Sequence, residues 1–161
     1  MPKVKLDRID RKILNDLQEQ GRMTNVELAE RAGISAPPCL RRVRALEEAG
    51  VIKGYHADID AGTLGFGVMV FAQVGLSTQS ETDLKKFEDL VRSWPLVREC
   101  YLVSGEADYI LKIVAEDWDA YQKFLTTYLT TAPNVSHIKS ALGIRVAKHK
   151  PGVPVEIEEN R

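Results

Sequence analysis

The stretch that decides the fold is Gly21–Gly50, which reads GRMTNVELAERAGISAPPCLRRVRALEEAG. Thr24 followed three residues later by Glu27 has the pattern of a capping box, which satisfies free amide groups at the start of a helix. Gly33 then supplies a turn residue, and a second amphipathic run follows it. Two short helices joined by a tight glycine turn predict a helix-turn-helix, a motif that places its second helix in the major groove of DNA.

Three helices are predicted in residues 1–59, each with one apolar side. The first repeats apolar residues at helical spacing and stops at Gly21. The positions that we expect to face inward are Leu6, Ile9, Ile13, Leu14 and Leu17 in the first helix, Val26, Leu28, Ala29 and Ala32 in the second, and Leu40, Val43, Leu46 and Ala49 in the third. Val51–Tyr55 follows as a short extended segment with a turn glycine, which suits a small wing.

A helical projection of residues 35–49 separates an apolar side from a polar one. Leu40, Val43, Leu46 and Glu47 fall on one side, and Pro38, Arg41, Arg42 and Ala45 fall opposite. We therefore expect Arg41 and Arg42 to contact bases or phosphates, with Arg44 on the flank. Arginine suits this task because its planar fork can meet two acceptors of guanine or of a phosphate at once.

The third helix opens with Ser35-Ala36-Pro37-Pro38. Proline is tolerated in a first helical turn because the amides there have no partner within the helix. The two prolines also remove amides that Ser35 would otherwise cap, or that an anion would meet. Ser35 is then either available to contact a phosphate or simply marks the turn, and both interpretations stay open. Pro37 joins Ser35 in the predicted DNA-binding set.

Further phosphate contacts are predicted around the motif. Arg22, Thr24 and Asn25 begin the second helix, which crosses the DNA backbone in this motif, and Lys53 lies in the expected wing. For each of these residues alone, the stronger alternative is a solvated surface position. For the whole segment, the alternative is a three-helix bundle that docks another protein.

Composition agrees with a globular protein, since 44% of the residues are hydrophobic and 28% are charged. Residues 1–56 hold 11 lysines and arginines against 8 acidic residues, whereas residues 57–161 hold 11 against 15. A basic front and an acidic back suggest that only the front meets a polyanion. Cys39 and Cys100 are far apart, no secretory signal or membrane-length apolar run is visible, and we expect a cytoplasmic, nucleoid-associated protein.

The chain is predicted to divide into a DNA-binding domain at residues 1–59, a glycine-containing hinge at 60–67, a second domain at 68–150 and a loose tail at 151–161. The second domain changes to alternating strand patterns. Its expected elements are strands at 68–76, 97–103, 108–114 and 135–148 and helices at 81–94 and 118–130, the second with Trp118, Tyr121, Phe124, Leu125 and Leu129 buried. This order is βαββαβ, a ferredoxin-like unit, so the fold class is α+β.

Three stretches carry a resemblance to a known family: LDRIDRKIL at 6–14, GRMTNVELA at 21–29 and ISAPPCLRRVRALE at 34–47. With ECYLVSGEADY at 99–109, they resemble the Lrp/AsnC family of leucine-responsive, or feast/famine, regulators. The resemblance implies a winged helix-turn-helix joined to a ligand-binding domain called RAM. It also implies dimers that assemble further, often to octamers, and amino acids as effectors. One departure is Ser140, where leucine-responsive members often carry threonine, so a hydroxyl is kept and a methyl is lost.

A bound amino acid needs an acceptor for its ammonium group and donors for its carboxylate. In the turn at 104–108, Asp108 can supply the acceptor, and the amides near Gly105 and Glu106 can supply the donors. By resemblance, the effector sits between dimers against this turn and the last strand, which makes Ser136 and Ser140 the matching candidates. The alternatives are that Gly105 and Asp108 only form a β-turn, or that the domain only oligomerises.

Two other functions are weighed against a regulator. An enzyme lacks support, because His56, His137 and His149 are scattered and no nucleophile with a placed base, phosphate loop or metal-ligand motif is present. We accordingly expect no catalytic residue, no metal and no cofactor other than an effector. An architectural protein that wraps DNA without sensing anything differs from a local regulator in degree, because bending DNA needs many contacts to offset its cost.

Overall fold

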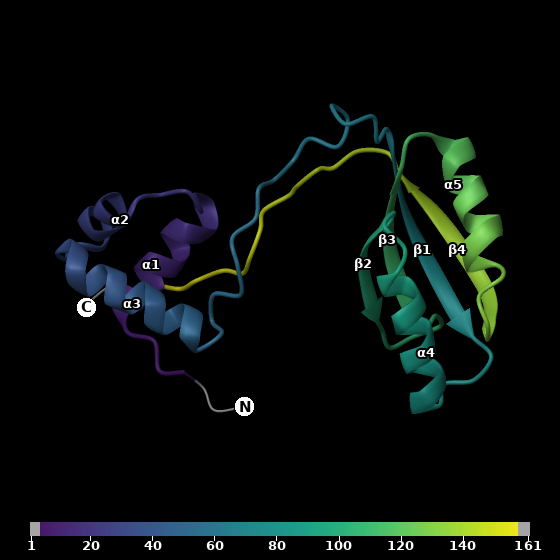
Figure 1. Cartoon of the computed structure of the whole chain (residues 1–161), viewed down its shortest axis with the longest axis horizontal. Coiled ribbons are helices and arrows are strands. Elements are labelled where there is room, and N and C mark those ends of the chain that lie inside the picture. The colour runs from purple at the N-terminus through teal and green to yellow at the C-terminus, as the bar shows by residue number, and fades with distance from the viewer. Residues whose placement is uncertain (1–3, 158–161) are drawn as a thin grey trace. The chain divides into compact units, whose positions relative to one another are not determined.

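The computed structural model describes residues 4–157, and none of the helices in that range is long and apolar enough to cross a membrane. The chain forms two compact units (Figure 1). The first takes the chain up to Asp58 and again from Lys148, and the second takes Ile59–Ala147. The polypeptide therefore passes between the units twice, once in each direction.

The first unit contains α1 (Arg8–Glu19), α2 (Asn25–Ala32) and α3 (Ala36–Glu48). The Thr24–Glu27 capping box at the start of α2 is confirmed, and Gly33 ends α2 with φ of 75°, a conformation that glycine adopts without strain. The side chains that make the core of this unit are Ile13, Leu28, Ala29, Ala32, Cys39 and Leu46. The helix-turn-helix inferred from the sequence is therefore present.

The inward side of α3 differs from the one we expected. Cys39 is fully buried, whereas Leu40 is 38% exposed and Ala49 is also exposed. On α2, Val26 is 58% exposed rather than inward. The physical reason on α3 is that cysteine packs as a small apolar residue, so the helix turns Cys39 toward the core and Leu40 outward.

Val51–Tyr55, the extended segment that we expected as a wing, forms no strand in the structure. Among the described residues, no strand lies between α3 and the first strand of the second unit. Val51 and Ile52 instead donate their backbone amides to the Leu46 carbonyl at 2.9 and 3.1 Å, and they pack on the helical core. A lone extended segment has no second strand to satisfy its backbone, so it folds back on the end of α3.

Residues 151–157, which we expected to be part of a loose tail, belong to the first unit, as do residues 148–150, which we assigned to the second domain. The Gln18 side-chain amide donates to the Val153 carbonyl at 3.0 Å and accepts from the Val153 amide at 2.7 Å. Lys150 pairs with Glu19 at 3.0 Å. These contacts hold the returning chain against α1, so the segment that we expected to be a tail belongs to the first unit.

The second unit is one antiparallel sheet with helices packed on one face. Its elements are β1 (Val68–Leu76), α4 (Glu81–Arg92), β2 (Val97–Leu102), β3 (Tyr109–Ala115), α5 (Trp118–Phe124), the π-helical turn η1 (Leu125–Leu129) and β4 (Val135–Gly143). Figure 1 shows the strands in the order β2, β3, β1, β4. The βαββαβ order is confirmed. Trp118 is an exception to the expected core: it is 43% exposed and stacks on Tyr121.

The two faces of the sheet differ in what covers them. Val70 and Ala72 of β1 are fully buried against α4 and α5, while Phe71 between them is 39% exposed on the other face. Phe71 pairs with Lys112 of β3 and Ala141 of β4, so these side chains share its face. The second face therefore carries apolar side chains that no helix of the described chain covers.

Candidate DNA-binding surface and effector site

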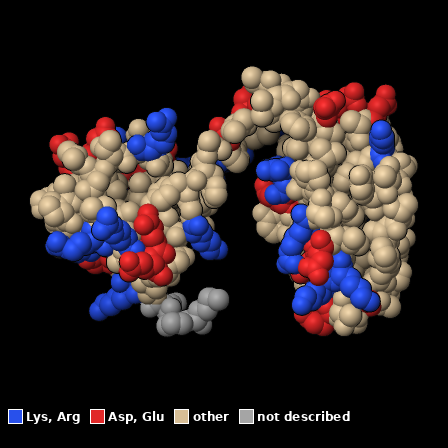
Figure 2. Space-filling model, viewed as in Figure 1, with Lys and Arg blue, Asp and Glu red and all other residues tan. Residues whose placement is uncertain are grey.

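One side of α3 points to solvent, and we call it the outer face of α3. It consists of Pro37, Leu40, Arg41, Arg44, Ala45 and Glu48, all of which are exposed. Their spacing of three and four residues places them along one stripe of the helix. Arg41 and Arg44 make no side-chain hydrogen bond or ion pair with any residue in 4–157. Figure 2 shows lysine and arginine side chains gathered over α3, beside acidic ones.

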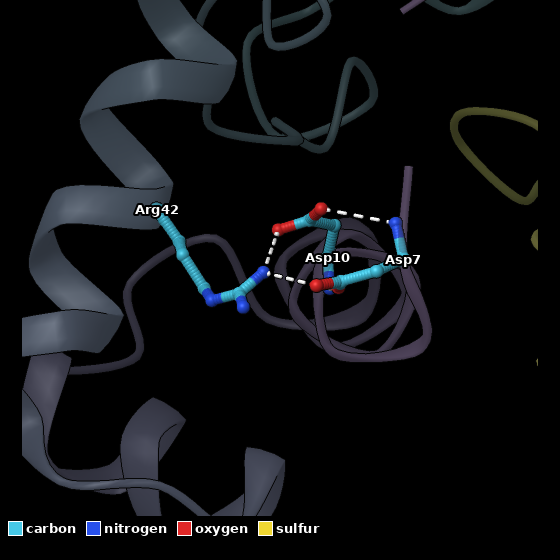
Figure 3. Close-up of polar contacts among 3 residues, drawn as sticks. All are labelled: Asp7, Asp10 and Arg42. Atoms are coloured by element: carbon cyan, nitrogen blue, oxygen red, sulfur yellow. Dashed lines mark hydrogen bonds and ion pairs between the residues drawn. The ribbon is translucent and has the colours of Figure 1, made fainter. Parts of the chain in front are cut away.

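Arg42 does not share that face, which corrects our expectation. Its Nη1 donates to Asp7 Oδ2 at 2.7 Å and to Asp10 Oδ1 at 2.8 Å, and its side chain is only 33% exposed (Figure 3). The projection from sequence could not include this pair, because the carboxylates come from the start of another helix. Arg42 therefore ties α3 to α1.

Asp7 and Asp10 are also hydrogen bonded to each other, independently of Arg42. The Asp10 amide donates to Asp7 Oδ1 at 2.9 Å, and the Asp7 amide donates to Asp10 Oδ2 at 3.1 Å, which forms a capping box at the start of α1. The hydrogen bond from the Asp10 amide, reinforced by Arg42, lowers the pKa of Asp7 below its ordinary value. Hydrogen bonds to Asp10 and Asp7 raise the pKa of Arg42.

The predicted phosphate contacts fall into two groups. Arg22, Ser35 and Lys53 are exposed, and Ser35 makes no capping hydrogen bond. Thr24 and Asn25 are engaged within the motif instead: Thr24 Oγ1 donates to Glu27 Oε2 at 2.8 Å. Asn25 Nδ2 donates to the Ala36 carbonyl at 2.8 Å, while its Oδ1 is buried without a partner among the described residues.

Asn25 is therefore a correction, because its half-buried amide links the start of α2 to the start of α3 rather than pointing outward. The Ala36 carbonyl that it holds belongs to the first turn of α3, so Asn25 fixes the angle between the helices of the motif. Its sequence signal, a polar residue after an N-cap, is the same for an exposed and for an inward amide.

In the second unit, the turn at 104–108 keeps its residues exposed except at its end. Gly105 has φ of 140°, which favours glycine, and a Cβ added there would meet no atom within 4 Å. Glu106 is exposed and lies 3.5 Å from Lys139 of β4. Asp108 Oδ2 accepts the Leu76 amide at 2.6 Å and lies 3.5 Å from Gln79 Nε2. The Asp108 carboxylate thus caps the end of β1.

The candidate serines of β4 also have partners. Ser136 Oγ donates to the Gly75 carbonyl at 2.9 Å, and Ser140 Oγ is hydrogen bonded to the Tyr121 hydroxyl. The Glu106–Lys139 pair brings the turn to β4, so the structure does join the two segments that we expected to be neighbours. Lys139 is a member of this group that sequence reasoning missed, since a lone exposed lysine carries no signal.

Two cavities in the described part of the second unit lie outside this group of residues. One of about 440 Å³ lies between α4 and β2 and is lined by residues that include Glu88, Arg98 and Cys100. Another of about 330 Å³ lies between the end of α4 and α5. None of the predicted effector residues lines either cavity. Within residues 4–157, no three His, Cys, Asp or Glu side chains are grouped to hold a metal ion.

Comparison with known proteins places both units. Residues 6–53 match a family model for winged helix-turn-helix DNA-binding domains. Residues 69–153 match the model of the Lrp/AsnC ligand-binding domain. This chain belongs to the Lrp/AsnC family. It is a transcriptional regulator with a DNA-binding and a ligand-binding domain, and the family is not one of enzymes.

Relatives in this family are similar over nearly their whole length. The leucine-responsive regulatory protein of Rhizobium meliloti is 55% identical over 91% of this chain and 94% of that protein. A transcriptional regulator of Neisseria meningitidis, solved as a complex with L-Met, has a TM-score of 0.89 at 36% identity over 93% of this chain and 97% of that one. AsnC of Escherichia coli has a TM-score of 0.82 at 25% identity, over 94% of this chain and 100% of that one.

Proposed function

We propose that this Lrp/AsnC regulator reads double-stranded DNA with the outer face of α3 and changes its DNA binding in response to a free amino acid. The observation that carries the DNA-reading part is that Arg41 and Arg44 are exposed on one stripe of the second helix of the motif and have no partner among the described residues. Arg22, Ser35 and Lys53 are proposed to contact flanking phosphates, because they are exposed in the same unit.

The amino-acid effector is proposed to bind against the turn at 104–108 and β4. Support comes from the chemistry of Asp108 and the turn amides, and from the Neisseria relative that was solved with L-Met. The bonds already made by Asp108, Ser136 and Ser140, and their absence from the linings of both cavities, favour a site that a second copy of the chain completes.

Self-association is proposed to begin on the uncovered face of the sheet. Phe71 and Tyr101 are 39% and 56% exposed there, and burying such side chains against a second copy removes apolar area from water. We propose a dimer on this face that assembles further, toward an octamer. We also propose that the regulator works in the cytoplasm on nucleoid DNA and needs no metal or cofactor besides the effector.

The experiment is fluorescence anisotropy with labelled operator duplexes at several salt concentrations, combined with mass measurement in solution with each of a panel of amino acids. Affinity for DNA is expected to fall steeply with salt because phosphate contacts release counterions. At least one amino acid is expected to shift both the assembly and the affinity. A panel in which no amino acid changes the mass or the DNA affinity would contradict the sensing proposal and leave the DNA-binding proposal intact.

A further inference from the structure

Leu40 is an apolar side chain on the surface that is proposed to meet DNA. It is 38% exposed, while its neighbour Cys39 is fully buried. It is absent from both the buried core of the first unit and the partly buried residues packed on that core. The unit therefore covers Leu40 less than it covers the residues of its core.

An exposed leucine alone has no functional meaning, because single apolar residues are common on protein surfaces. The position of Leu40 gives it one. It lies three residues after Pro37, directly before Arg41 and four residues before Arg44, so it occupies the centre of the outer face of α3. It also lies in the N-terminal half of this helix, the part that contacts base edges in helix-turn-helix proteins.

The major groove offers an aliphatic side chain one apolar group, the 5-methyl of thymine. Cytosine has hydrogen at the corresponding carbon, so a leucine placed there distinguishes thymine from cytosine without any hydrogen bond. Arg41 beside it offers the complementary chemistry, two donors for the acceptors of guanine. Together the two residues can read an apolar and a polar edge in adjacent base pairs.

We propose that Leu40 is a specificity-determining residue that packs on a thymine methyl group in the operator. This proposal rests on the proposed reading of DNA by the outer face of α3. Burying one methyl group changes affinity by about fourfold, which sets the size of the effect at each contacted thymine. Pro37 lies one turn before Leu40 on the same stripe.

The test is a double-mutant cycle between the full-length protein and its DNA. Each thymine of a short operator duplex, chosen by selection from random sequences with the wild-type protein, is replaced in turn by deoxyuridine, which removes only the methyl group. Affinities are measured by anisotropy for the wild type and for Leu40→Ala. We expect one or more positions where deoxyuridine weakens wild-type binding about fourfold and has no effect on Leu40→Ala binding.

The matched control is Val26→Ala, which truncates another exposed aliphatic side chain of the same unit, on α2 rather than α3. It is expected to keep every deoxyuridine penalty of the wild type. Leu40→Ala is expected to remain folded, which thermal unfolding checks, because Leu40 lies outside the buried core. A Leu40→Ala protein that keeps every penalty, or a wild type with no penalty at any thymine, overturns the proposal.

Failure of this proposal is distinguishable from failure of DNA reading by α3. If α3 reads DNA without Leu40, Arg41→Ala weakens binding while the deoxyuridine penalties are the same with and without the leucine. If α3 does not read DNA, neither Arg41→Ala nor Leu40→Ala changes affinity.

Discussion

The outer face of α3 and the turn at 104–108 with β4 are both proposed to bind a ligand, yet their side chains are in opposite states. Arg41 and Arg44 have no polar partner among the described residues. Asp108 and Ser140 are each hydrogen bonded within their own unit. The outer face of α3 can bind DNA without breaking an internal bond, whereas a ligand at the turn and β4 meets side chains that already hold other groups of the unit in place.

This difference suits the outer face of α3 to recognising DNA and suits the turn with β4 to changing the protein when a ligand binds. A ligand shifts a conformational equilibrium only through its different affinity for two states, and a site whose side chains change partners provides such a difference. In the second unit the exchange at Asp108 touches the end of β1, because Asp108 holds the Leu76 amide. An effector that replaced the Leu76 amide at Oδ2 of Asp108 would therefore free the end of a central strand.

The largest expected effect is on DNA affinity when Arg41 is truncated. Arg41→Ala should weaken binding by roughly 1–3 kcal/mol if the side chain reads a base, and the loss should relax specificity at one position. Stability should stay at the wild-type value, because the side chain has no partner within residues 4–157. Anisotropy across single-base operator variants measures the affinity and specificity, and thermal unfolding measures the stability.

The matched control for Arg41 is Arg31→Ala, which removes the same charge from α2. Arg31 lies 3.8 Å from Asp16, and its side chain is 57% exposed. Its loss should lower affinity only slightly and equally for all sequences. Equal losses for the two variants would mean that Arg41 acts through general charge and that α3 reads bases with other residues.

The next effect concerns Asp108, and it tests whether one carboxylate has two tasks. Asp108→Ala leaves the partly buried Leu76 amide without its acceptor and should lower stability by roughly 1–3 kcal/mol. Asp108→Asn keeps an oxygen acceptor and removes the charge that an effector ammonium needs. It should therefore keep most of the stability and lose the effector response, as measured by chemical unfolding and calorimetry. An asparagine variant with a full response would exclude the carboxylate from effector binding.

Sequence reasoning predicted the elements better than the side-chain partners. The capping box at Thr24 and the βαββαβ order are local patterns of spacing and polarity, and both are confirmed. The returning chain at Val153 and its partner Gln18 are separated by 135 residues, and nothing in either segment signals the contact. The expected inward side of α3 was also wrong by one position. The helical projection placed Leu40 in the core because it did not count Cys39 as an apolar residue, whereas the structure buries Cys39.

Arg42 sharpens the comparison, because it stands next to Arg41 and is internally bonded. Arg42→Ala removes two charge-assisted hydrogen bonds from a half-exposed cluster and leaves two carboxylates facing each other. We expect a loss of roughly 1 kcal/mol in the unfolding free energy of the first unit, since exposed ion pairs contribute little and hydrogen-bonded ones contribute more. DNA affinity should fall uniformly across sequences because α3 is less firmly held.

The Arg42 experiment needs a measurement that distinguishes attachment of α3 to α1 from direct contact with a DNA base. Arg42→Lys keeps the charge and can still pair with one carboxylate, so it should recover part of the stability. If Arg42→Ala instead relaxes specificity at one base position and leaves unfolding unchanged, Arg42 leaves Asp7 and Asp10 when DNA binds and reads a base itself.

The smallest effect is a pH dependence set by Asp7. Its pKa is lowered from an ordinary 3.8, first by the Asp10 amide and then by Arg42. A carboxyl whose pKa is lower in the folded state stabilises the fold above its ordinary pKa, and that contribution disappears as the pH falls through the lowered pKa. The stability difference between wild type and Asp7→Asn, measured by chemical unfolding, should therefore be constant near neutral pH and shrink below about pH 4. If the difference for Asp7→Asn does not change with pH, the Asp7 carboxylate contributes no charge-dependent stability, and Arg42 holds α3 through Asp10 alone.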